Sequence, residues 1–244
     1  MFDGSKTFPI RFSWETAVDV LLFLEERTQF LRQFFAMAAE PFVERKRKIE
    51  QEEEPFVPPY SEDSEPAFIT EWLEADDSLH VLAYSCVSML AGSLHLYFES
   101  WVDQSGVPVD KERHKKAFKL GKFAGYKEHF VEQFGIDFDS CPADLNLLEE
   151  IILARNVVQH PPSIASNRTR YADSDFQKLR KPFFLDERET KLLSDHAEDL
   201  PRYLLPTVHV SKDQLFVAIN ETEKFARWFE GQIAGVRHGC NLRL

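Results

Sequence analysis

The chain contains few cysteines and few glycines, and it lacks the motifs of several large enzyme classes. Its 244 residues include nine glycines and three cysteines, Cys86, Cys141 and Cys240, which are widely spaced. An odd number of cysteines excludes a complete disulfide framework, and their spacing offers no zinc site. There is also no metal-ligand cluster, no glycine-rich phosphate loop and no nucleophile motif. We therefore expect a protein of a reducing compartment that needs neither a cofactor nor a metal.

Positive charge is also scarce. The formal net charge of -12 argues against a protein that coats nucleic acid indiscriminately, because that mode of binding needs a broad cationic surface. A local basic site is still allowed. Residues 1–14 lack the basic start and long apolar run of a signal peptide, and no later stretch approaches a membrane span without charges. These features predict a soluble cytoplasmic protein that does not enter a membrane.

Large apolar side chains are abundant. The chain is 43% hydrophobic and has 22 phenylalanines and four tryptophans, which suits long elements that pack rings against one another. The length allows one large domain or two small ones, and we favour one helical domain over residues 1–244. The composition and the periodicities below predict an all-α bundle of at least five helices.

The first half of the chain predicts two long helices separated by a loop. Ser13 can cap a first core helix that continues to residue 40. The charged run at 44–54 is compatible with a second, solvated helix, but an exposed spacer is the favoured interpretation. Four prolines make residues 55–66 an irregular loop, and apolar residues at helical spacing then predict a long central helix at 68–101.

The following segments predict shorter helices. Residues 111–135 carry seven lysines and arginines against three glutamates, with aromatic residues at helical intervals. An ordinary amphipathic helix is the favoured interpretation, and an RNA-contacting face is the alternative. A short helix is expected within 186–200, and a brief extended segment at 207–210. Ser211 and Gln214 then form a capping-box pattern that opens the last helix.

A helix at 142–160, expected at the centre of the bundle, ends in a polar group. Asn156 and His160 lie four residues apart on one face, and the long side chain of Arg155 can bend toward them. Pro161 follows and disfavours helical dihedrals at His160, so the histidine ends the helix. A histidine that titrates near neutrality beside a fixed cation suits phosphodiester cleavage. Arginine, four residues, then histidine is expected about 0.5 times per chain of this composition, and asparagine after the arginine lowers this to about 0.01.

Residues 155–160, RNVVQH, resemble the motif of the HEPN superfamily, in which an arginine, often followed by a polar residue, precedes a histidine by four to six intervening residues. The resemblance covers about residues 68–163. It implies a helical bundle that forms a homodimer, so that two motifs line one cleft. Many members are metal-independent ribonucleases of toxin, defence or RNA-processing systems, and others retain the fold for binding or scaffolding. One subgroup has a tyrosine two residues after the histidine, which a partner antitoxin modifies, and Pro162 occupies that position here.

The resemblance also implies roles for single residues. Arg155 would hold the scissile phosphate of RNA, His160 would transfer a proton at the ribose 2'-hydroxyl, and Asn156 would orient one of them. Members often add an acid from an earlier helix, for which Glu99 is our choice. Two interpretations follow: a ribonuclease, or a catalytically silent RNA-binding or protein-interaction scaffold. Burial of Arg155 and His160 in a closed salt-bridge network would favour the scaffold, and an accessible pair would favour the enzyme.

Overall fold

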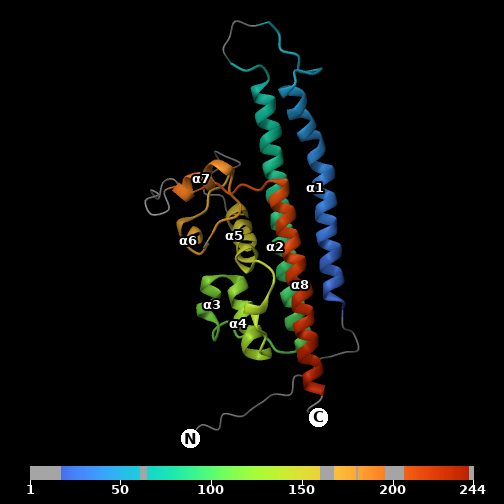
Figure 1. Ribbon diagram of the computed structural model, residues 1–244, viewed down its shortest axis with the longest axis vertical. Helices are drawn as coiled ribbons and strands as arrows, with labels where there is room; N and C mark the ends of the chain where they lie inside the picture. The colour runs from blue at the N-terminus through green and yellow to red at the C-terminus, as the bar shows by residue number, and fades with distance from the viewer. Residues whose placement is uncertain (1–17, 61–64, 160–167, 180, 196–205, 242–244) are drawn as a thin grey trace.

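The computed structural model describes residues 18–60, 65–159, 168–179, 181–195 and 206–241. These residues form an all-α bundle, as the sequence predicts, and contain no β-strand (Figure 1). The expected extended segment at 207–210 makes one isolated bridge, between Thr207 and Arg170.

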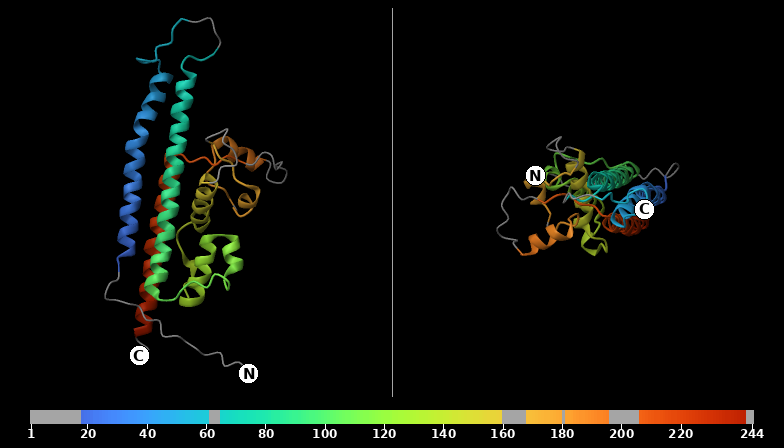
Figure 2. Two further views of the ribbon diagram at one scale, coloured as in Figure 1. Left: turned by 180° about the vertical axis from the view of Figure 1, so that it is seen from behind. Right: turned by 90° about the horizontal axis from the view of Figure 1, so that it is seen from above.

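Three long helices run along the length of the molecule. α1 (Val20–Glu50) and α2 (Ile69–Ser105) are antiparallel, and α8 (Lys212–Asn241) packs against both (Figures 1 and 2). The shorter helices lie on the other side of α2. They are α3 (Lys115–Leu120), α4 (Lys122–Phe134), the 3-10 helix η1 (Phe138–Ser140), α5 (Leu145–Gln159), α6 (Asp173–Phe176) and α7 (Glu187–Asp195).

The expectation that α1 gives way to a spacer beyond Pro41 is wrong. α1 continues through Pro41 to Glu50, because Pro41 lies on an exposed face and the residues after it are held against α2. Lys46 Nζ lies 2.6 Å from Asp76 Oδ1 and 4.1 Å from the centre of the Trp72 ring. The helix starts later than predicted, at Val20 with Asp19 as its cap, and Ser13 lies outside the described residues. The described parts of 55–66 are irregular, as predicted.

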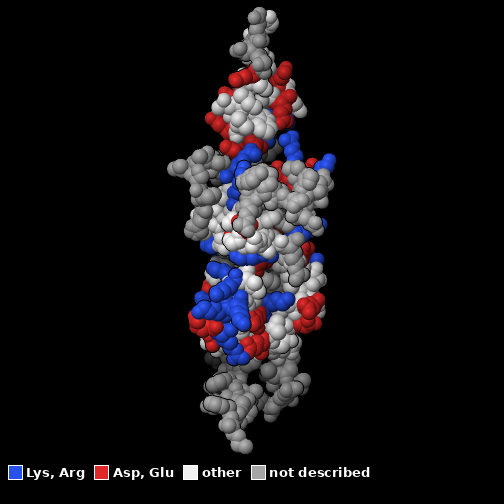
Figure 3. Space-filling model, turned by 90° about the vertical axis from the view of Figure 1, so that its left-hand side faces the viewer, with Lys and Arg blue, Asp and Glu red and all other residues white. Residues whose placement is uncertain are grey.

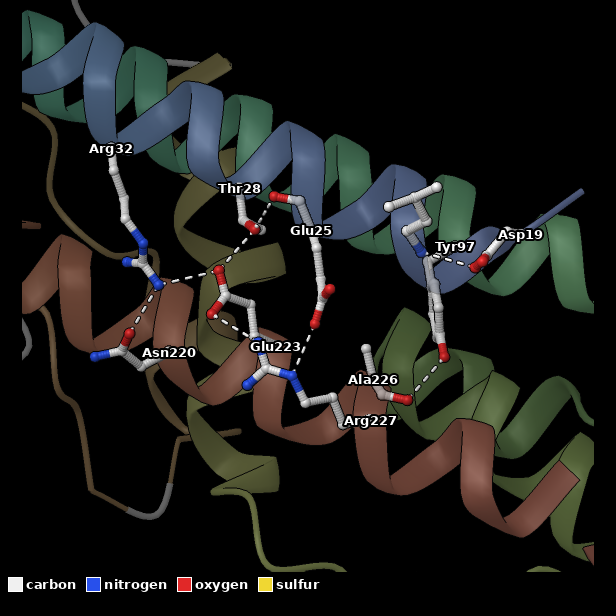
Figure 4. Close-up of polar contacts among 10 residues, drawn as sticks. Asp19, Glu25, Thr28, Arg32, Tyr97, Asn220, Glu223, Ala226 and Arg227 are labelled. Carbon is white, nitrogen blue, oxygen red and sulfur yellow. Dashed lines mark hydrogen bonds and ion pairs between the residues drawn. The ribbon is translucent and has the colours of Figure 1, made fainter. Parts of the chain in front are cut away.

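Polar contacts fix the rotation of α1 about its own axis. Glu223 Oε1 of α8 accepts hydrogen bonds from Thr28 Oγ1 at 2.7 Å and from an Arg32 nitrogen at 3.0 Å (Figure 4). Arg227 Nε donates to Glu25 Oε1 at 2.7 Å. The face of α1 that carries Leu24, Leu31 and Phe35 is thereby held against the rest of the bundle, and these three side chains are buried. The side of α1 that faces away from the bundle remains on the surface.

The centre of the bundle is a cluster of aromatic rings. Phe98 of α2 lies within 6.2 Å, between ring centroids, of Phe225 and Phe229 of α8 and of Phe130 of α4. Tyr97 adds a hydrogen bond from its hydroxyl to the Ala226 carbonyl at 3.1 Å. Phenylalanines of α2, α4 and α8 therefore form one aromatic core that joins these three helices.

The basic segment 111–135 forms two helices instead of one. α3 ends and α4 begins at Gly121, where the carboxylate of Glu149 from α5 approaches the backbone. A Cβ atom on Gly121 would collide with that carboxylate. Glu149 Oε2 accepts a hydrogen bond from the Ala124 amide at 3.2 Å and so caps the start of α4. The expected core face is confirmed, because Phe123 and Phe130 are buried.

α5 begins later than the sequence predicts. Pro142 does not open it, because residues 138–140 form the separate 3-10 helix. Asp144 supplies the cap instead, since its Oδ1 accepts from the Asn146 and Leu147 amides at 2.9 and 3.2 Å. At the C-terminal end of the chain, Ser211 and Gln214 exchange the two capping-box hydrogen bonds that the sequence predicts.

α2 is long and apolar enough to cross a membrane by length and composition, which corrects the expectation that no stretch approaches such a span. Its most apolar 18-residue window has a mean hydropathy of 1.4, and 56% of that window is buried inside the bundle. A helix at the core of a soluble bundle has the same properties.

Candidate functional site

α5 presents the first two residues of the motif near its C-terminal end. Ile151, Ile152 and Ala154 are buried, whereas Arg155 and Asn156 are half-buried. An Arg155 guanidinium nitrogen donates to Asn156 Oδ1 at 3.0 Å. No carboxylate among the described residues forms an ion pair with Arg155. Within the described residues, the guanidinium is thus held in place by a neutral group and has no acidic partner.

His160 lies outside the described residues, as do Pro161 and Pro162. It directly follows Gln159, the last residue of α5. Its role in the site therefore stays a prediction from the sequence.

Glu99 contacts a histidine that the sequence reasoning missed. Glu99 lies on α2 with about half of its side chain exposed, and its Oε1 is 3.3 Å from His95 Nε2. The other ring nitrogen of His95 is 3.3 Å from the Tyr126 hydroxyl of α4. Glu99 and Arg155 are both described by the structure, and they form no hydrogen bond or ion pair with each other. The four-residue spacing of His95 and Glu99 on a helix was the signal that could have found this pair.

Burial lowers the pKa of His95, and the positive charges of Lys122, Arg155 and Lys111 lower it further, against the opposing charge of Glu99. Burial also raises the pKa of Tyr126 to about 12, so its hydroxyl keeps its proton and can donate to His95 Nδ1. The remaining proton of the neutral imidazole then lies on Nε2, facing Glu99. A hollow of about 570 Å³ borders Glu99, Tyr126 and Lys111. We call His95, Glu99, Lys122, Tyr126 and Arg155 the Arg155 site.

A basic face adjoins this site. Figure 3 shows Lys and Arg side chains gathered at the level of α3 and α4, on the side of the molecule that carries these helices. Some of these charges are neutralised locally, because Arg113 pairs with Glu132 and Lys115 with Glu112. Four exposed lysines have no ion pair with any described residue, and we call them the basic face: Lys111, Lys116, Lys119 and Lys122. In a chain with a net charge of -12, such a group attracts an anion.

Glu149 is a second titratable group that the sequence did not reveal. Burial raises its pKa to about 7, against the opposing effects of the Ala124 amide and the Lys178 charge. Its Oε1 atom is buried and accepts no hydrogen bond from the described residues. Burial also raises the pKa of the neighbouring Glu150, but Glu150 accepts hydrogen bonds from the Tyr171 hydroxyl at 2.8 Å and from the Phe183 and Phe184 amides.

No group of three or more histidine, cysteine or acidic side chains among the described residues is arranged to hold a metal ion. No protein-family model, curated protein or solved structure matches the chain.

Proposed function

We propose that the protein is a metal-independent endoribonuclease that cleaves RNA at a site formed by Arg155, Asn156 and His160. The observation that carries the proposal is a half-buried guanidinium without a carboxylate partner among the described residues, held by Asn156 beside the basic face. A scaffold that used Arg155 for stability would be expected to pair it with an acid, since an uncompensated buried charge is costly. A cation that has no acidic partner in the described part of the chain supports the enzyme interpretation.

The proposed reaction uses the ribose 2'-hydroxyl as the nucleophile. His160 takes the proton from that hydroxyl, and the 2'-oxygen bonds to phosphorus. The bond from phosphorus to the 5'-oxygen breaks, the 5'-oxygen takes a proton from water, and the products are a 2',3'-cyclic phosphate and a 5'-hydroxyl. Arg155 stabilises the negative charge that builds up on the phosphoryl oxygens. Lysines of the basic face hold the flanking phosphates of the strand.

The test compares cleavage by the wild type, Arg155→Ala and His160→Ala, with mixed RNA in EDTA. We expect wild-type products that end in 2',3'-cyclic phosphate, no cleavage of DNA, and losses of about 100- to 1000-fold in both variants. Arg45→Ala is the control, because Arg45 pairs with an exposed glutamate at the far end of α1, and its activity should match that of the wild type.

Cleavage that survives both substitutions would remove the motif from the mechanism. The absence of any cleavage by the wild type across diverse RNAs would favour the scaffold. Far-ultraviolet circular dichroism of each variant separates loss of activity from loss of the fold.

A further inference from the structure

A hollow of about 670 Å³ lies where α8 begins against α1 and α2. α1 and α2 continue beyond the first residue of α8 (Figure 1), so the third helix no longer covers them at this level and a space opens beside them. The lining comes from residues within 35–44 of α1, within 76–80 of α2 and at 209–212, and we call the space the α8 hollow. Its volume falls within the roughly 300–1,000 Å³ that small-molecule sites occupy.

Much of the lining is apolar. Phe35 and Ala39 of α1, Leu79 of α2 and Val210 contribute to it, and all of them except Leu79 are buried. The Phe35 ring meets the Phe216 ring of α8 edge to face, with 6.4 Å between centroids, so the α1 wall is held in place. Apolar walls of this kind favour a hydrocarbon ring over water.

Two histidines lie side by side in the lining. His80 of α2 and His209 have their ring centroids 5.0 Å apart and their planes at 70°. The His209 backbone amide donates to the Phe184 carbonyl at 2.9 Å. The preceding residue, Val208, is held too, because its carbonyl accepts from the Tyr84 hydroxyl at 2.6 Å. These bonds fix the backbone that carries the His209 ring.

The ring nitrogens of His209 form no hydrogen bond or ion pair with the residues that the structure describes, whereas His80 Nε2 lies 3.4 Å from Asp76 Oδ2. Burial lowers the pKa of both histidines, and the charge of Arg168 lowers it further, against the opposing acidic charges nearby. Both imidazoles are therefore neutral near pH 7, each with one nitrogen that donates and one that accepts. A hydroxyl group matches His209, because it can accept from the first nitrogen or donate to the second.

The charges around the hollow do not select an ion. Asp76 is bound by Lys46 and by Arg168 at 2.6 Å each, and Glu44 is paired with Arg47. The other charged side chains of the lining are one acid and one base: Glu40 and Lys212. Because acids and bases are matched in this way, an uncharged ligand is favoured over an anion or a cation.

We propose that the α8 hollow binds an uncharged ring compound that carries a hydroxyl group. The ring lies against Phe35 and Leu79, and the hydroxyl forms a hydrogen bond with the His209 imidazole. A rigid ring suits the site better than a flexible chain, because it loses less conformational entropy on binding. The proposal does not depend on ribonuclease activity, so a failure to cleave RNA would leave it unchanged.

Equilibrium dialysis of the purified full chain tests the proposal with three probes that share one ring system. 2-Naphthol carries the hydroxyl, 2-methylnaphthalene has the same shape without a polar group, and 2-naphthoate is charged. At about pH 7.5, where a phenol keeps its proton, we expect 2-naphthol to bind with a dissociation constant on the order of 100 µM. 2-Naphthoate should bind at least about tenfold more weakly.

Three variants locate the binding. His209→Phe keeps a ring but removes both nitrogens, so it should weaken 2-naphthol binding by at least about tenfold and leave 2-methylnaphthalene binding within about twofold. Ala36→Phe fills the hollow from an exposed position of α1 and should weaken the binding of both probes by at least about tenfold. Met37→Phe is the matched control, because Met37 is 76% exposed and lies outside the lining, and it should bind both probes as the wild type does.

The proposal is overturned if the wild type does not bind 2-naphthol up to about 1 mM, or if binding survives both His209→Phe and Ala36→Phe. Equal losses of 2-naphthol and 2-methylnaphthalene in His209→Phe would exclude the hydrogen bond and overturn it as well. Tighter binding of 2-naphthoate would make the hollow an anion site instead. If circular dichroism shows that His209→Phe unfolds, Ala36→Phe decides the outcome, because its position is exposed.

Discussion

Two polar clusters include residues of α2, and they differ in how far their charges are paired. Near its start, Asp76 accepts from Lys46 and from Arg168 at 2.6 Å each, and its Oδ2 lies 3.4 Å from His80. The His80 ring is 5.0 Å, between centroids, from that of His209. We call these five residues the His80 cluster. Burial alone would raise the pKa of Asp76, but the hydrogen bond from Lys46 and the nearby positive charges lower it below its usual value.

The Arg155 site, farther along α2, leaves its cations without such partners. Lys122 and Arg155 form no ion pair with the described residues, although both act on His95. Burial lowers the pKa of His80 and His209, as it does that of His95, so histidine titration does not separate the two regions. Hollow size does not separate them either, since the hollow beside the His80 cluster is about 670 Å³ and the other is about 570 Å³. The two regions differ in the pairing of their charges. A saturated cluster, in which the charges have ion-pair partners, stabilises the fold. An unsaturated cluster, in which the cations have no such partner among the described residues, can bind a charged ligand.

The largest expected effect comes from breaking the saturated cluster. Asp76→Ala leaves Lys46 and Arg168 without their shared acceptor, and we expect the free energy of unfolding to fall by about 2 kcal/mol. Glu99→Ala removes an exposed acid of the unsaturated site and should change it by less than about 0.5 kcal/mol. Urea unfolding followed by circular dichroism measures both. Equal effects would show that the two regions do not differ in this way.

A smaller effect is expected from neutralising the basic face. Lys116→Gln with Lys119→Gln removes two charges that form no ion pair with the described residues, and we expect about tenfold weaker binding of a single-stranded oligonucleotide at 0.15 M salt. The slope of log affinity against log salt should decrease by about 1.4. A 2'-deoxy oligonucleotide serves as the probe, so that binding is measured apart from cleavage.

Arg45→Gln with Lys48→Gln is the matched pair for this experiment, because it removes two charges from the far end of α1. Its affinity should stay within about twofold of the wild type. An equal loss in both pairs would mean that net charge, and not the basic face, governs binding.

The smallest effect concerns Glu149. Burial raises its pKa from 4.5 to about 7, so the folded state keeps a proton that the unfolded state releases. The stability that the protonated form contributes is complete below about pH 4.5 and is lost as the pH rises to about 7. Between pH 5.5 and 6.5, the wild type should therefore lose about 1 kcal/mol relative to Glu149→Gln. Glu26→Gln, an exposed control, should follow the wild type, and parallel curves for wild type and Glu149→Gln would contradict the expected role of burial.

The sequence predicts much of the fold because periodic apolar residues identify a helix without knowledge of its neighbours. The core face of Phe123 and Phe130 is confirmed for this reason, and the capping box at Ser211 and Gln214 is confirmed because it too is a local pattern. The passage of α1 through Pro41 could not be predicted in the same way. It depends on Lys46, which reaches Asp76 and Trp72 across 30 and 26 residues of chain.

In the candidate site, too, local features could be predicted from the sequence and contacts between distant segments could not. The adjacent pair of Arg155 and Asn156 is visible in the sequence, and the structure joins the two by a hydrogen bond. Glu99 follows an apolar stretch in the sequence, and in the structure it lies beside His95. Tyr126 reaches His95 from another helix, 31 residues away, so no local pattern could reveal that contact. The lack of an ion pair between Arg155 and the described residues could not be predicted either, because it depends on where acidic side chains from distant parts of the chain lie.

The position of α8 has a consequence for synthesis of the chain on the ribosome. α8 begins at Lys212, yet it supplies Phe225 and Phe229 to rings that α2 contributes from Tyr97 and Phe98. At roughly 5–20 residues per second, the α2 rings emerge at least 5 s before their partners. The nascent chain therefore exposes the α2 rings until α8 has been synthesised, and exposed apolar surface of this kind is what chaperones bind.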